Sequence, residues 1–181
     1  MEVLPTRLPG LVLVKLAIHG DERGFFLEMY RRDAYASVGI EVDFVQDNHS
    51  RSQRSVLRGL HFQEGRGQAK LVHVAQGRIF DVAVDLRPDS PTFGQYESFD
   101  LDDRQHLQLF IPGGFAHGFC VVSEVADVIY KVSSYYAPDR ERGLAWNDSA
   151  IAIKWPIPDP VLSDRDRQNP RLRDIEADLH G

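Results

Sequence analysis

The sequence predicts an all-β protein, an antiparallel sandwich or jelly roll, on three observations. Short apolar or alternating runs recur along the chain, and turn residues close each of them. Ten prolines and fourteen glycines favour short strands and turns over long helices. The 181 residues contain no repeat, low-complexity tract or linker-like stretch. We therefore expect a single domain over 1–181, long enough to bury a sizeable core.

The expected elements follow these runs in order. An apolar run predicts a strand over 11–16, which ends before the turn residues at 19–21. The next run predicts a strand over 24–30, and a short helix over 31–38 is expected to stop at Gly39. A last helix is expected over 171–179, beyond a proline-rich stretch. The remaining strands are expected over 44–46, 56–62, 69–75, 78–86, 96–101, 106–111, 117–122 and 127–135.

Composition argues against several classes of function. The net charge of −6 is unlike that of a dedicated nucleic-acid binder, which normally carries a basic excess. No run approaches the roughly 20 apolar residues of a membrane helix, and residues 1–20 show no signal peptide. The single cysteine, Cys120, lies in an apolar run and is expected to be a buried, inert thiol. We therefore expect a protein of the reducing cytoplasm, without a nucleic-acid or membrane partner.

Polar side chains within strand-like runs are the candidates for chemistry, because strands of a small barrel point alternate side chains inward. In the run over 57–63, regular alternation places Arg58 and His61 on opposite faces. Gly59 between them is expected to introduce a bulge that brings both side chains toward one cavity.

Three further residues, Lys70, His117 and Tyr130, lie in similar runs. Burying ionisable groups costs several kcal/mol unless they are paired, so a strand protein tends to hold them for a reason. Taken singly, however, each of these residues is more typical of core packing or of a solvated strand face than of catalysis.

Short motifs along the chain resemble one enzyme family. Pro112-x-Gly114-x-x-His117 is similar to the second short motif of the cupin superfamily. The wider set resembles the dTDP-4-dehydrorhamnose 3,5-epimerase family. Nine stretches match this family in order, which is far more specific than any one of them. They cover 20–28 (GDERGFFLE), 44–50 (FVQDNHS), 56–63 (VLRGLHFQ), 79–85 (IFDVAVD), 90–95 (SPTFGQ), 114–119 (GFAHGF), 130–131 (YK), 146–148 (WND) and 162–166 (LSDRD).

The resemblance implies a cupin-type jelly-roll barrel with a few short peripheral helices. It implies an isomerase that converts dTDP-4-dehydro-6-deoxy-D-glucose to dTDP-4-dehydro-L-rhamnose by inverting C3 and C5, in dTDP-L-rhamnose biosynthesis. Both carbons adjoin the ketone, so loss of either proton gives an enolate. No cofactor is expected, because the chain has no G-x-G-x-x-G fingerprint and proton transfer needs no hydride carrier.

The resemblance also implies the catalytic roles. His61 matches the family's base and Asp166 matches the carboxylate that orients it, and a neutral imidazole can take a proton at neutral pH. Tyr130 matches the acid on the opposite face of the sugar ring, since inversion needs removal from one face and return from the other. Lys70 resembles the cation that stabilises the enolate oxygen.

Substrate-binding positions follow in the same way. Arg23 and Arg58 match positions that bind the diphosphate or nucleotide, where guanidinium groups suit phosphate oxygens. The family works as a homodimer in which an N-terminal segment completes the neighbour's site, so Arg23, Phe25 and Glu28 are expected to act in trans. The other positions implied around the nucleotide base and the sugar are Gln46, Asn48, His117 and Tyr136.

Three alternatives stay open. A metal-dependent cupin dioxygenase or isomerase usually carries a His-x-His pair, which here reads His61-Phe62-Gln63, and an amide is a poor ligand for transition metals. We therefore expect no metal site. A non-catalytic sugar-nucleotide-binding module would not need the proton-transfer residues. A C3-only or C5-only epimerase would retain the same base and carboxylate, although the complete set of motifs favours the double reaction.

Overall fold

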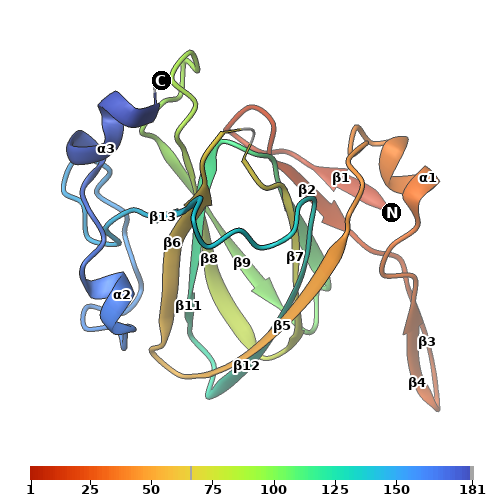
Figure 1. Cartoon of the computed structure of the whole chain (residues 1–181). Helices are drawn as coiled ribbons and strands as arrows, with labels where there is room; N and C mark the ends of the chain where they lie inside the picture. The colour runs from red at the N-terminus through yellow and green to blue at the C-terminus, as the bar shows by residue number, and fades with distance from the viewer. Residues whose placement is uncertain (66, 180–181) are drawn as a thin grey trace.

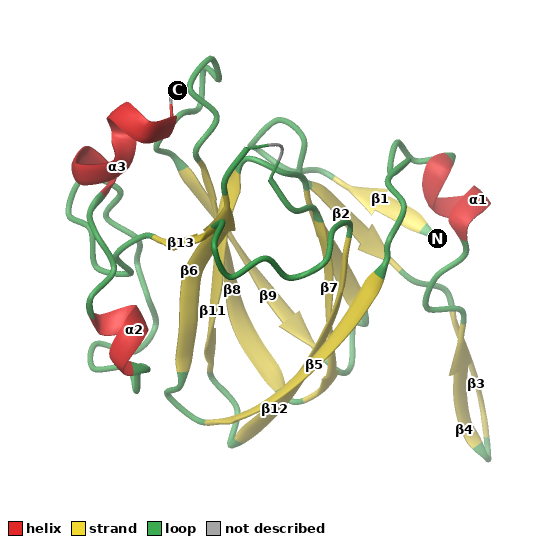
Figure 2. Cartoon of the chain, in the orientation of Figure 1, coloured by secondary structure: helices red, strands yellow, loops and turns green. Residues whose placement is uncertain are grey.

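The computed structural model describes residues 1–65 and 67–179, and it confirms the all-β prediction (Figures 1 and 2). Two antiparallel sheets form a barrel, and a separate two-stranded hairpin extends away from it (Figure 1). In the described residues, no helix is both long and apolar enough to cross a membrane.

The strands are arranged as follows. One sheet contains, in spatial order, β1 (Glu2–Leu4), β2 (Val12–Lys15), β10 (Leu107–Ile111), β7 (Lys70–Gln76), β12 (Val125–Val132) and β5 (Gln46–Gln53). The facing sheet contains β13 (Glu141–Gly143), β6 (Leu57–Gln63), β11 (Phe115–Val121), β8 (Arg78–Asp85) and β9 (Tyr96–Asp102). The hairpin pairs β3 (Ile18–Asp21) with β4 (Gly24–Leu27), and the helices are α1 (Arg32–Ala36), α2 (Asp164–Arg167) and α3 (Leu172–Leu179).

Most predicted strands and both predicted helices are confirmed to within a few residues, but several details were wrong. The strand predicted over 44–46 is the much longer β5, whose sequence QDNHSRSQ is polar throughout and shows no apolar alternation. The turn predicted at 19–21 lies within β3, and the strand predicted over 24–30 ends at Leu27. The short elements β1, β13 and α2 were not predicted.

Alternation along the strands separates three apolar layers. Between the sheets, Val72 of β7 packs in one cluster with Ile79 of β8. On the outer side of the smaller sheet, Leu60 of β6 packs in another cluster with Leu172 of α3. A third cluster joins Leu71 of β7 to the region of α1. Because the faces alternate, the neighbours of these outward residues, such as His61 and Lys70, lie along the interior of the barrel.

A buried ion pair closes the end of β8. Asp85 is inaccessible to solvent, and it accepts hydrogen bonds from the backbone and guanidinium of Arg87 at 3.0, 2.8 and 2.7 Å. The hydroxyls of Ser90 and Thr92 each donate to it at 2.6 Å. Burial alone would raise the pKa of Asp85, but these hydrogen bonds outweigh it and lower the pKa to about 2. Arg87 also donates to the Pro9 carbonyl at 2.8 Å, so the pair fastens the N-terminal segment to the barrel.

We expect Asp85→Asn to lower the free energy of unfolding by about 3 kcal/mol at pH 7, because it leaves Arg87 without its partner. The folded-state pKa of Asp85 lies below its unfolded value, so its contribution is present above about pH 4 and is lost as the pH falls toward 2. The difference between the wild type and the variant, measured by urea unfolding, is therefore expected to narrow between pH 5 and pH 2.

Asp100→Asn is the matched control. Asp100 forms an exposed ion pair with Arg78 at 3.3 Å on the neighbouring strand, and its loss is expected to cost less than about 0.5 kcal/mol. Equal losses in the two variants would contradict a structural role for the buried pair.

Candidate active site

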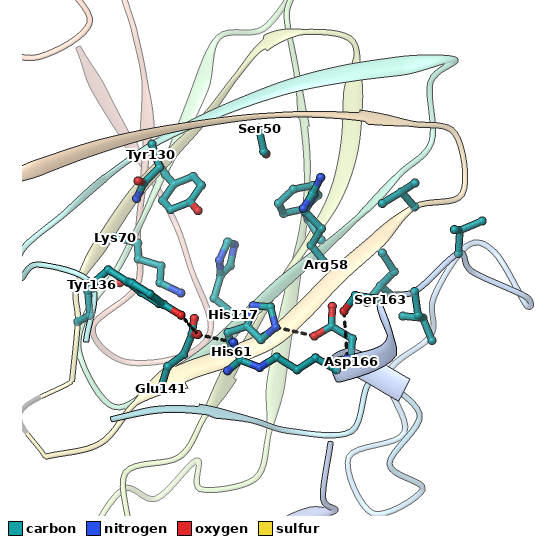
Figure 3. A pocket seen from close by; sticks show the side chains of 18 of the residues that line it. Ser50, Arg58, His61, Lys70, His117, Tyr130, Tyr136, Glu141, Ser163 and Asp166 are labelled. Atoms are coloured by element: carbon teal, nitrogen blue, oxygen red, sulfur yellow. Dashed lines mark hydrogen bonds and ion pairs between the residues drawn. The ribbon is translucent and has the colours of Figure 1, made fainter. Parts of the chain in front are cut away.

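A cavity of about 720 Å³ opens between the two sheets (Figure 3). Strands β6 and β11 supply one wall, β5, β7 and β12 supply the other, and the segment 161–166 closes one side. Nine of the twelve predicted site residues line this cavity: Gln46, Asn48, Arg58, His61, Lys70, His117, Tyr130, Tyr136 and Asp166.

The bulge predicted at Gly59 is confirmed. His61 and Arg58 of β6 are paired with His117 and Phe119 of β11, so three steps along β6 match two steps along β11. Gly59 has a φ of +121°, and a Cβ atom there would lie 2.6 Å from the Cα of Gly118. Only glycine fits this position. The extra residue turns Arg58 and His61 toward the same cavity, which regular alternation would not do.

His61 and Asp166 form a hydrogen-bonded dyad. The Nε2 atom of His61 lies 2.6 Å from Oδ1 of Asp166, and the Asp166 side chain is only 5% exposed. Burial opposes ionisation of Asp166, but the hydrogen bonds from His61 and from the Gly59 backbone N–H lower its pKa below the usual value. Because Asp166 is ionised, it can only accept a hydrogen bond, so we assign the imidazole proton to Nε2 of His61. This tautomer leaves Nδ1 of His61 free to take a proton.

The helix α2 delivers Asp166 to this position. Ser163 caps the helix, and its hydroxyl accepts a hydrogen bond from the Asp166 backbone N–H at 3.1 Å. Just before the helix, Val161 exchanges backbone hydrogen bonds with Ser55 and Leu57 at 2.8 and 2.9 Å. The carboxylate is therefore held by a tail segment that is itself paired to the start of β6.

Lys70 and Tyr130 come from the sheet that faces His61. Burial lowers the pKa of Lys70 to about 8, although the charges of Glu141 and Asp81 act in the opposite direction. Burial raises the pKa of the Tyr130 phenol, so this group is protonated at neutral pH. The cavity thus holds a cation and a neutral acid across from the dyad.

A second histidine–aspartate pair lies beside the first. Nε2 of His117 is 2.9 Å from Oδ2 of Asp81, and both residues are buried. His117 lies opposite His61 across the β6–β11 ladder. Sequence reasoning missed Asp81, although its place on the inward face of β8, between Ile79 and Ala83, was a readable signal.

Three cavity residues on the C-terminal side were also missed. Glu141 accepts hydrogen bonds from the Tyr136 hydroxyl at 3.1 Å and from Arg165. Ser163 and Arg165 come shortly before Asp166 in the chain. The Ser-x-x-Asp pattern at 163–166 is typical of a helix start and could have predicted α2. No local sequence pattern indicates Glu141.

The three N-terminal residues lie elsewhere in this chain. Arg23 is at the tip of the β3–β4 hairpin, where it pairs with Asp21, and Phe25 is 62% exposed on the same hairpin. Glu28 lies 3.7 Å from Arg31 at the base of α1. None of them lines the cavity.

The described part of the chain contains no group of three or more histidine, cysteine, aspartate or glutamate side chains arranged to hold a metal ion. The sulfur of Cys120 is buried, and burial raises the pKa of this thiol to about 11. It therefore remains a neutral thiol at physiological pH.

Comparison with known proteins gives consistent matches. The family model for dTDP-4-dehydrorhamnose 3,5-epimerase matches residues 5–174. An enzyme of that name from Salmonella typhimurium is 49% identical over 175 residues, which are 95% of this chain and 96% of the relative. Another from Shigella flexneri is 46% identical over 178 residues, covering 97% and 98% of the two chains.

A solved structure from Legionella pneumophila has the same architecture. It is described as a dTDP-6-deoxy-D-glucose-3,5-epimerase in complex with dTDP-4-keto-L-rhamnose, and it matches with a TM-score of 0.95 and 46% identity. The match covers 98% of this chain and 96% of that chain. The cupin-like fold expected from the sequence is thereby confirmed. On its sequence and its structure, this chain belongs to the dTDP-4-dehydrorhamnose 3,5-epimerase family.

Proposed function

We propose that this protein is a 3,5-epimerase that converts dTDP-4-dehydro-6-deoxy-D-glucose to dTDP-4-dehydro-L-rhamnose. The observation that carries the proposal is the placement of the His61–Asp166 dyad and Tyr130 on opposing walls of one cavity. An inversion needs a base on one side of the sugar ring and an acid on the other. The name of the Legionella relative, solved with dTDP-4-keto-L-rhamnose, supports the choice of substrate.

His61 acts as the base in this proposal. Its Nε2 is held by Asp166 at 2.6 Å, so the free Nδ1 takes the proton from C3 or C5 of the substrate. Asp166 orients the ring and stabilises the imidazolium that forms, because its lowered pKa keeps it ionised.

Lys70 and Tyr130 complete the reaction. Removal of either proton places negative charge on the C4 oxygen, and the Lys70 ammonium stabilises that charge in a partly desolvated site. Tyr130, which stays protonated at neutral pH, then returns a proton to the opposite face of the carbon. Gln46, Asn48, His117 and Tyr136 line the same cavity and supply contacts to the sugar and the nucleotide.

The nucleotide diphosphate needs cations, and the proposal draws them from two subunits. Arg58 lines the cavity, with its Nε hydrogen-bonded to Ser52 at 2.9 Å. Arg23 is presented on a hairpin that protrudes from the barrel, and Phe25 and Phe26 of that hairpin are 62% and 70% exposed. The hairpin forms a sheet of its own, and its Phe25 ring contacts the His106 ring at 4.8 Å. A two-stranded hairpin with exposed aromatic rings is marginally stable by itself, so we expect a second subunit to be its binding partner. We therefore propose a homodimer that works in the cytoplasm, in which this hairpin brings Arg23, Phe25 and Glu28 to the neighbour's cavity.

We expect the enzyme, incubated with dTDP-4-keto-6-deoxyglucose in deuterium oxide, to introduce deuterium at both C3 and C5. Both positions adjoin the ketone and are served by the same base. Proton NMR of the sugar follows each position separately. Exchange at one carbon only would identify a single epimerase, and a bound substrate without exchange would identify a binding module.

Substitution of the two opposing groups is expected to separate removal from return. His61→Ala should lower exchange at both carbons by about 10²–10⁴-fold, the usual contribution of a positioned base. Tyr130→Phe should retain exchange while net inversion, followed by product NMR, slows strongly. If Tyr130→Phe abolished exchange as well, the phenol would be required for proton removal and the assignment of roles would be wrong.

A mixed dimer tests the shared site. When Arg23→Ala and His61→Ala chains are co-expressed, one site of each mixed dimer combines an intact Arg23 with an intact His61. Activity should then recover to about a quarter of the wild-type value, because half of the dimers are mixed and each has one intact site. Pairing His61→Ala with Asp166→Ala is the control, and it should recover nothing because both residues belong to one subunit. The absence of recovery in the first pair would contradict action in trans.

A further inference from the structure

We propose that Glu141 is a positioning residue of this reaction: its carboxylate is the counter-charge of the Lys70 ammonium and ties Tyr136 and the dyad helix into one wall. This inference rests on the proposed epimerase function and assigns a role to a residue that the proposal above does not use.

The geometry places Glu141 where three parts of the site meet. It lies on β13, which pairs with β6 so that Glu141 is opposite Gln63 and Gly143 is opposite His61. Its carboxylate accepts hydrogen bonds from Tyr136 at 3.1 Å and from Arg165 (Figure 3). Glu141 therefore joins three parts of the site. These are β6, which carries His61, the side chain of Tyr136, and α2, which carries Asp166.

The charge of Glu141 also matters for the chemistry. Its side chain is 21% exposed, and burial would raise its pKa, but Arg165, His61 and Tyr136 together lower the pKa below the usual value. Glu141 is therefore an anion inside a cavity that must accommodate a negative enolate. Such a charge is unfavourable for the reaction unless it serves a neighbouring cation.

Arg165 is the ion-pair partner of Glu141, and Lys70 is a second cation on which this charge acts. The Lys70 side chain extends toward Glu141 and Tyr136 (Figure 3). Burial brings the pKa of Lys70 down to about 8, and Glu141 is the first of the two carboxylates that act against this decrease. A lysine with a pKa near the working pH is charged in only part of the molecules, so the loss of one counter-charge removes a measurable share of the reactive form.

Besides Glu141, one other carboxylate acts on the pKa of Lys70. Asp81 on β8 is the second carboxylate, and it is already bound to His117 of β11 at 2.9 Å. The remaining titratable or charged groups around the cavity are Arg58 and His61 on β6, Tyr130 on β12, Tyr136 in the loop before β13, and Arg165 and Asp166 on α2.

The decisive comparison is between Glu141→Gln and Arg165→Gln. Both break the same ion pair, but only the first removes the negative charge beside Lys70. We expect Glu141→Gln to move the alkaline limb of kcat/KM, measured as exchange at substrate concentrations well below KM, to lower pH by about 0.5–1 unit. Arg165→Gln leaves Glu141 charged, so its alkaline limb should stay in place or move to higher pH.

Glu64→Gln is the matched control. Glu64 pairs with Arg142 at 2.8 Å on the same edge of the sheet but does not line the cavity, so its profile should equal that of the wild type. Glu141→Asp retains the charge on a shorter side chain, and we expect it to retain the alkaline limb while KM rises through the lost contact with Tyr136. An unchanged limb in Glu141→Gln, or a uniform loss of rate at every pH in both glutamine variants, would overturn the proposal.

A second measurement is independent of turnover. NMR titration of ¹³C-labelled lysines, with Lys70→Arg to assign the Lys70 signal, should give a lower pKa for Lys70 in Glu141→Gln than in the wild type. If the wild type fails to exchange deuterium, the epimerase function is wrong, whereas an equal Lys70 pKa in the two proteins overturns only the role of Glu141.

Discussion

The hydrogen bond between His61 and Asp166 joins two segments that are 105 positions apart in the chain. One partner sits on an inner strand of the barrel and the other on a four-residue helix in the C-terminal tail. Most of the unusual local structure serves this bond. The bulge at Gly59 turns His61 inward, the Gly59 N–H donates to Asp166, and Ser163 sets the start of α2. Without these supports, neither side chain would reach the other.

The interior of the barrel is divided between an apolar core and a polar cavity, and pairing between elements makes the polar part stable. Asp81 of β8 holds His117 of β11, and Glu141 of β13 holds Arg165 of α2. Buried charges are tolerated in a protein only when such partners compensate for lost hydration. Lys70 is the exception: burial lowers its pKa to about 8, and the charges of Glu141 and Asp81, which already belong to other pairs, only partly oppose this decrease. In the proposed reaction, this residue with the least local compensation serves as the electrophilic cation.

Much of the fold could be predicted from the sequence, because β6, β7 and β8 are short runs rich in apolar residues and bounded by turn residues. Strand β5 could not, since it is held by pairing with β12 and its side chains are polar on both faces. Gly59 was a readable signal for a bulge. The pairing of His61 with Asp166 was predicted only from the family resemblance, and Glu141 was not predicted. Both involve tail or edge residues whose positions are decided by long-range contacts, which leave no periodic trace in the local sequence.

The position of Asp166 in the chain also affects how the active site is assembled. Every strand of the barrel ends at or before Gly143, and the dyad carboxylate follows in the tail. The strand ladders of both sheets therefore contain no residue of the segment that carries Asp166. A barrel on which this segment had not docked would hold only one member of the dyad, His61. The dyad is complete only when residues 161–166 have docked along β6.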